Sequence, residues 1–88
     1  MTKQETLFEF PCDFPIKVMG ATREGFAQAI VEIVSKHAPD FDAATVEMRP
    51  SRAGHYLSVT CVIRATSRPQ LDALYRELTS HPWVKIVL

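Results

Sequence analysis

The side chains best suited to metal binding or nucleophilic chemistry are scattered in this sequence. Its histidines are His37, His55 and His81, and no two of them have the spacing of an HxxxH motif. The two cysteines, Cys12 and Cys61, form no CxxC motif and are too few for a disulfide framework. No nucleophile elbow of the GxSxG type is present. We therefore expect no metal and no cofactor.

One segment resembles a phosphate-binding loop. Residues Val18–Arg23, with the sequence VMGATR, resemble the loop of acylphosphatases, in which an arginine after a glycine-ended strand grips the anion. That resemblance also implies an asparagine that orients the attacking water, and this sequence contains no asparagine. Arg23 is therefore interpreted as an exposed residue in the first turn of a helix. We predict that the protein is not an enzyme.

The charge is neutral overall but uneven along the chain. Ten basic residues match ten acidic ones, which argues against nucleic-acid binding because that binding requires many positive charges. Residues 1–47 contain eight acids and four bases, whereas residues 48–71 contain four arginines and no acid. This basic stretch predicts either contact with an anionic ligand or acidic partner, or a solvated edge. Its arginines are Arg49, Arg52, Arg64 and Arg68.

The composition indicates one small globular domain. Hydrophobic residues make up 47% and charged residues 23% of the 88 residues, and the apolar runs are too short for a signal peptide or a membrane span. We expect a cytoplasmic protein that does not contact the membrane. Pro11 and Pro15 favour an extended N-terminal arm over residues 1–13, followed by a single domain over residues 14–88.

Hydrophobic spacing predicts two helices and four strands. Apolar residues at helical spacing indicate a helix over residues 23–37 with Thr22 as its N-cap. Ser67 and Gln70 have the spacing of a capping box at the start of a second helix. Alternating patterns predict strands over residues 16–19, 45–49, 56–65 and 83–88.

The order of these elements predicts an α+β ferredoxin-like βαββαβ sandwich. It has a four-stranded antiparallel sheet, two helices on one face, and the first and third strands at the centre. Residues 16–19 and 57–62, at the centre of these two strands, contain no aromatic of the kind that stacks on bases in an RNA-binding sheet. If Leu57, Val59, Cys61 and Ile63 lie beneath the helices, the opposite face is open. We expect that face to carry Tyr56, Ser58, Thr60, Val62 and Arg64, either Lys17 and Met19 or Ile16 and Val18, and Trp83, Lys85 and Val87.

Several motifs together resemble one family. They include Phe14–Gly20, His37–Pro39, Ser51–Thr60, Leu74–Leu78 and a Val-x-x-Val-Leu end. In these runs the chain resembles the YbeD-like family of small bacterial proteins, from Leu7 to Leu88. The resemblance implies a ferredoxin-like fold similar to ACT regulatory domains, without an established activity.

Two candidate sites follow. Similarity to ACT domains implies pairing of two copies and an amino acid bound near the loop after the first strand, which suggests Lys17, Gly20 and Thr22 as ligand-binding residues. Gly20 either lets a ligand approach closely or merely allows a tight turn. The second site is a surface on the hairpin and third strand, facing an acidic peptide or small anion, or only solvent. Its residues are Arg52, Tyr56, Ser58, Thr60 and Arg64, with Lys17 nearby.

We expect a non-enzymatic regulatory or adaptor domain that acts by protein–protein contact. The alternative is an ACT-like homodimeric sensor of an amino acid or small carboxylate. The adaptor hypothesis predicts an apolar patch on the open face and no buried polar pocket. The sensor hypothesis predicts that Gly20→Val abolishes ligand binding and leaves the fold intact.

Overall fold

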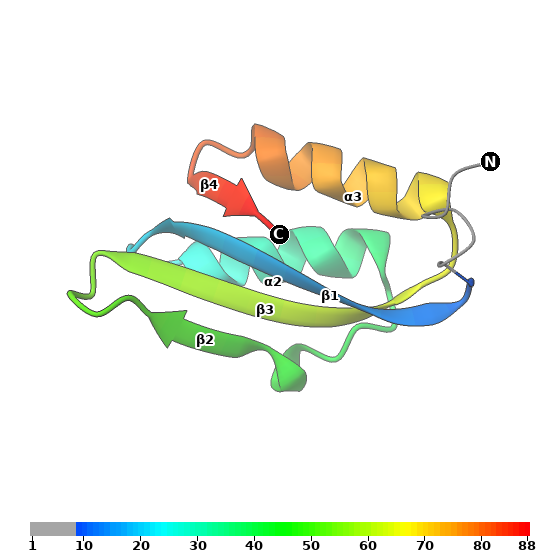
Figure 1. Ribbon diagram of the computed structural model, residues 1–88, viewed down its shortest axis with the longest axis horizontal. Coiled ribbons are helices and arrows are strands. Elements are labelled where there is room, and N and C mark those ends of the chain that lie inside the picture. The colour runs from blue at the N-terminus through cyan, green and yellow to red at the C-terminus, as the bar shows by residue number, and fades with distance from the viewer. Residues whose placement is uncertain (1–8) are drawn as a thin grey trace.

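The structure, a computed structural model, describes residues 9–88 and has the expected ferredoxin-like topology (Figure 1). The sheet is antiparallel with the strand order β2-β3-β1-β4, so the first and third strands are central as predicted. No helix in residues 9–88 is long and apolar enough to cross a membrane. The elements are β1 (Cys12–Ala21), α2 (Phe26–His37), the short 3-10 helix η1 (Ala43–Thr45), β2 (Glu47–Pro50), β3 (Tyr56–Ala65), α3 (Arg68–Ser80) and β4 (Val84–Val87).

Strand β1 begins at Cys12, four residues earlier than the alternation predicted, and Pro15 lies inside it. The backbone N–H of Lys17 points towards β4 and donates to the Leu88 carbonyl. The nitrogen of Pro15, two residues earlier, therefore faces the same edge, beyond the end of β4. A missing N–H costs little there, because no strand of residues 9–88 pairs with that edge of β1 at the level of Pro15. The predicted arm lies mostly in residues 1–8, outside the described residues.

The two helices start differently from one another. Ser67 caps α3 as predicted, since its Oγ accepts a hydrogen bond from the Gln70 N–H at 3.2 Å. The prediction for α2 was wrong: the helix starts at Phe26 after Gly25, whose φ of 83° is left-handed. Thr22 is not the N-cap, because its N–H donates to the His55 carbonyl and so extends the sheet pairing.

The core lies between the helices and one face of the sheet. On β1, Ile16 and Val18 are buried, so Lys17 and Met19 are on the opposite side. Two residues expected on the open face are instead packed against the core: Trp83, and Val87, which lies opposite Val18. Ile86, opposite Met19, takes the open side. The fully buried core includes Phe26, Ile30, Val34, Val59, Cys61, Ile63, Leu74 and Leu78.

Candidate functional site on the open face of the sheet

The sheet face opposite the helices is covered by no helix or strand of residues 9–88, and we call it the open face (Figure 1). Burial alternates along β3, so the predicted open-face residues of this strand are on that side. Strand pairing places Lys17 opposite Thr60, Met19 opposite Ser58, and Ile86 opposite Met19. The open face carries Lys17, Met19, Glu47, Arg49, Tyr56, Ser58, Thr60, Val62, Arg64 and Ile86.

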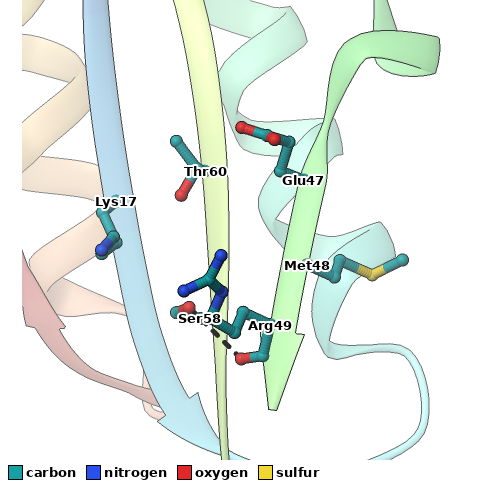
Figure 2. Close-up of a pocket in the computed structure, with 6 residues that line it drawn as sticks. All are labelled: Lys17, Glu47, Met48, Arg49, Ser58 and Thr60. Carbon is teal, nitrogen blue, oxygen red and sulfur yellow. Dashed lines mark hydrogen bonds between the residues drawn. The ribbon is translucent and has the colours of Figure 1, made fainter. Parts of the chain in front are cut away.

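A hollow of about 330 Å³ spans β1, β3 and β2 on this face, and we call it the charged hollow (Figure 2). Figure 2 shows Lys17 on β1, Ser58 and Thr60 on β3, and Glu47 and Arg49 on β2 around the charged hollow. The Met48 side chain points away from β3. The Ser58 hydroxyl donates to the Arg49 carbonyl at 3.3 Å. The charged hollow is lined by Lys17, Glu47, Met48, Arg49, Ser58 and Thr60.

Two cations in the charged hollow have no acidic partner within residues 9–88. Neither Lys17 nor Arg49 is within ion-pair distance of a carboxylate of that part of the chain, and Glu47 pairs with neither. By contrast, Arg64 pairs with Asp13 at 3.3 Å. The charged hollow therefore has a net formal charge of +1, and its two cations are available to bind an external anion.

A second, mainly apolar hollow of about 190 Å³ adjoins the first, and we call it the apolar hollow. The two hollows share Arg49 and Ser58, so one ligand can reach both. The apolar hollow is lined by Met19, Arg49, Pro50, Ser51, Tyr56, Leu57 and Ser58. The side chain of Tyr56, a residue 50% exposed, lies beside a charged site and is still open to solvent.

The structure does not bring the residues of the ligand site suggested at the first loop together. Lys17 is on the open face, whereas Gly20 is buried on the helix side. A Cβ at Gly20 would lie 2.2 Å from the Trp83 carbonyl oxygen and 2.8 Å from the Phe26 ring. Packing thus explains this glycine, and the expectation that Gly20→Val leaves the fold intact was wrong.

The basic stretch is divided between different surroundings. Arg64 pairs with Asp13 at the far end of β3, and Arg68 lies 3.7 Å from Asp72 on α3. Arg64 is four residues along β3 from Thr60, about 13 Å at the usual strand rise. Of the four arginines, only Arg49 lines the charged hollow. Arg52 lies in the β2–β3 hairpin, outside both hollows.

Sequence reasoning missed Glu47 as a site residue and named Arg49 only as part of the basic stretch. They are two apart on β2 and therefore point to the same side, opposite Thr60 and Ser58 respectively. Pairing the two predicted strands across the hairpin loop would have revealed them. Arg23 is exposed as predicted but precedes α2 rather than lying in its first turn, and its guanidinium lies 4.0 Å from the centre of the Trp83 ring.

The titratable groups whose pKa values shift lie away from the open face. Burial raises the pKa of the Cys61 thiol to about 11 in the core, and burial also raises the pKa of Tyr75. Hydrogen bonds from Lys36 and His37 on α2 lower the pKa of Glu77 on α3, each at 2.7 Å. No group of His, Cys, Asp or Glu in residues 9–88 could hold a metal ion. The pKa shifts of Cys61, Tyr75 and Glu77 are thus explained by burial and by hydrogen bonds between the helices.

Comparison with known proteins identifies the family of this chain. The family model described as "Protein of unknown function (DUF493)" matches residues 5–88. The chain belongs to the DUF493 family. A UPF0250 protein of Nitrosomonas europaea is 56% identical over 85 residues, which cover 97% of this chain and 98% of that protein. A UPF0250 protein of Bordetella pertussis is 58% identical over 85 residues, or 97% and 93% of the two chains.

The DUF493 match confirms the resemblance to YbeD-like proteins, and solved structures confirm the fold. Protein HP0495 from H. pylori has a TM-score of 0.74 at 13% identity, covering 92% of this chain and 85% of that one. The crystal structure of the ACT domain from GTP pyrophosphokinase of Chlorobium tepidum has a TM-score of 0.65 at 20% identity, covering 88% and 97%. At these identities the similarity shows the fold alone.

Proposed function

We propose that this member of the DUF493 family is a non-enzymatic regulatory or adaptor domain that binds another protein through its open face. One observation carries the proposal: Met19, Tyr56 and Ile86 form an apolar patch beside the charged hollow, and no helix or strand of residues 9–88 covers it. Tyr56 is 50% and Ile86 49% exposed. Apolar side chains gathered beside charges are typical of protein-binding surfaces.

The interior of the domain is apolar. The buried residues of the described chain include no polar or charged side chain. The groups with shifted pKa values lie in the core and between the helices, where packing and ion pairing account for them.

Site-specific photo-crosslinking tests this function. A photoreactive phenylalanine analogue replaces Val62 or Ile86 on the open face, or Glu32 on the exposed side of α2 as the matched control. In lysate of the source cells we expect one defined adduct from the open-face positions and none from position 32. Excess unlabelled protein should suppress the adduct, whereas excess Tyr56→Lys protein should not. An adduct formed only from position 32 would contradict the proposal.

The second candidate function is an ACT-like homodimeric sensor of an amino acid or small carboxylate. What supports this candidate is the similarity to an ACT domain. The packing around Gly20 counts against the particular ligand site expected at the first loop. Thermal unfolding with a panel of amino acids and short carboxylates separates the two candidates. A ligand at one hundred times its Kd stabilises by about 2.7 kcal/mol, so a panel without any melting shift contradicts the sensor.

A further inference from the structure

We propose that the partner presents a short acidic–apolar segment, with its carboxylate in the charged hollow and the neighbouring apolar side chain in the apolar hollow. This inference rests on the proposed function, because it names the chemistry of the partner that the open face would bind. The two hollows supply the argument, since they differ in character and meet at Arg49 and Ser58.

Charge favours an acidic group over a basic one. Lys17 and Arg49 lack carboxylate partners within residues 9–88, and Glu47 is the single acid that lines the charged hollow. The Thr60 hydroxyl, between Lys17 and Glu47 in the sheet, makes no hydrogen bond to the described residues. An incoming carboxylate can therefore accept hydrogen bonds from two cations and a hydroxyl without displacing an existing ion pair.

The shape favours a polypeptide segment over a small molecule. Small-molecule sites are mostly apolar and bury most of the ligand. The charged hollow is instead polar and lies on an open sheet face, so a small anion there would stay largely hydrated and bind weakly. A segment gains additional contact from Met19, Pro50 and Tyr56 in the adjoining apolar hollow.

Strand spacing sets the length of the motif. The Lys17–Thr60–Glu47 row and the Met19–Ser58–Arg49 row are two residues apart along the strands, about 7 Å. Consecutive side chains of an extended segment point to opposite faces, and alternate ones are also about 7 Å apart. A segment with an acidic and an apolar residue two positions apart can therefore fill both hollows at once.

An NMR titration of the ¹⁵N-labelled protein with three peptides tests the inference. The peptides are acetyl-ALEELA-amide, the glutamine version acetyl-ALQQLA-amide and the lysine version acetyl-ALKKLA-amide. We expect the glutamate peptide to shift the amide signals of Lys17, Met19, Arg49, Ser58 and Thr60, and to bind at least fivefold more tightly than the other two. Its affinity should fall as salt rises, because exposed charges are screened.

Charge-neutralising variants supply the matched controls. Lys17→Gln and Arg49→Gln should each weaken the glutamate peptide roughly three- to fivefold, the size of an exposed ion pair. Arg64→Gln removes a cation from the same face, but one already paired with Asp13, and should leave the affinity unchanged. Each variant must keep the dispersed spectrum of the folded protein.

The outcomes separate this inference from the function on which it rests. Equal binding of the glutamate and glutamine peptides, or an equal loss with Arg64→Gln, overturns the acidic motif. Acetate or phosphate binding as tightly as the glutamate peptide overturns it in favour of a small-anion site. If crosslinking from the open face succeeds and the glutamate peptide fails, the proposed function stands and the acidic motif falls. If crosslinks form only from position 32, both fall.

Discussion

At the scale of single residues, two glycines are required for different physical reasons. Gly20 lies where the Trp83 backbone and the Phe26 ring press against β1, and an added methyl group would overlap both. Gly25 has open space around it, but its φ of 83° strains any residue with a Cβ. The first requirement is steric and depends on distant parts of the chain, whereas the second belongs to the local backbone.

We therefore expect Gly20→Ala to cost about 2–3 kcal/mol of unfolding free energy, the scale of overpacking in a tight core. Gly25→Ala, the matched control, should cost about 1 kcal/mol from left-handed strain alone. Urea unfolding followed by the fluorescence of Trp83, the single tryptophan, measures both. A Gly20→Ala protein as stable as the wild type would show that Trp83 and Phe26 yield easily, and would reopen a ligand role for this loop.

At the scale of elements, Glu77 joins the two helices. Its carboxylate bonds to Lys36 and His37 at the end of α2, each at 2.7 Å, and so ties the C-terminal half of α3 to that helix. Hydrogen bonds from Lys36 and His37 are the largest causes that lower the pKa of Glu77. A carboxyl group whose pKa is lower in the folded chain adds stability above its unfolded pKa and loses it as the pH falls through the folded value.

We expect Glu77→Gln to be less stable than the wild type at pH 7. The difference in unfolding free energy between the two proteins should close as the pH falls below the ordinary glutamate range. Urea midpoints at pH 7, 5, 4 and 3 give the comparison. Glu32→Gln, on the exposed side of α2 with no ion pair in residues 9–88, is the control and should show no such closing gap. If the stability difference between Glu77→Gln and the wild type is constant with pH, the ion pairing of the Glu77 carboxylate adds nothing to stability.

Local patterns predicted those elements whose signals are local. Alternation gave β3 its full extent, and the Ser67–Gln70 spacing gave the start of α3. The start of β1 was missed because Pro15 normally ends a strand, and its tolerance depends on where β4 stops. The prediction of which β4 residues face the open side was wrong. This strand has apolar residues on both sides, so its pattern does not indicate which side is buried.

The candidate site was predictable only in part, for a related reason. The alternation of β3 placed Tyr56, Ser58, Thr60 and Val62 on the open face. The charged hollow needs the register between β2 and β3 and the choice of face for β1, and both are tertiary properties. The role of Gly20 stayed open at the level of sequence, because a glycine required by packing and one required by a ligand look the same there.

At the scale of the whole molecule, the two cysteines report on the cooperativity of the fold. Cys61 lies on a central strand with no exposed surface, and burial raises its pKa to about 11. Cys12, at the start of β1, is partly exposed. Alkylation of Cys61 requires the thiolate in contact with solvent, and exposing the middle of β3 means separating both helices from the sheet.

We expect iodoacetamide at pH 8 to modify Cys61 on the order of a thousandfold more slowly than Cys12, since a small domain is typically stable by about 5 kcal/mol or more. Mass spectrometry after timed labelling gives the two rates, and labelling in 8 M urea should make them similar. Equal rates in the native protein would mean that the sheet opens locally, without loss of the whole fold.

The central pairing of β1 with β3 also has a consequence for synthesis on the ribosome. Ala21 lies opposite Tyr56 and Cys12 opposite Ala65, so every β1 residue awaits a partner made 35 to 53 residues later. At about 5–20 residues per second, that delay lasts roughly 2–10 s. The hairpin of β2 and β3 has no such wait, because Pro50 pairs with Leu57. Phe14, Ile16 and Val18, whose partners are made 41 to 49 residues later, are thus apolar residues that a chaperone on the nascent chain would have several seconds to bind.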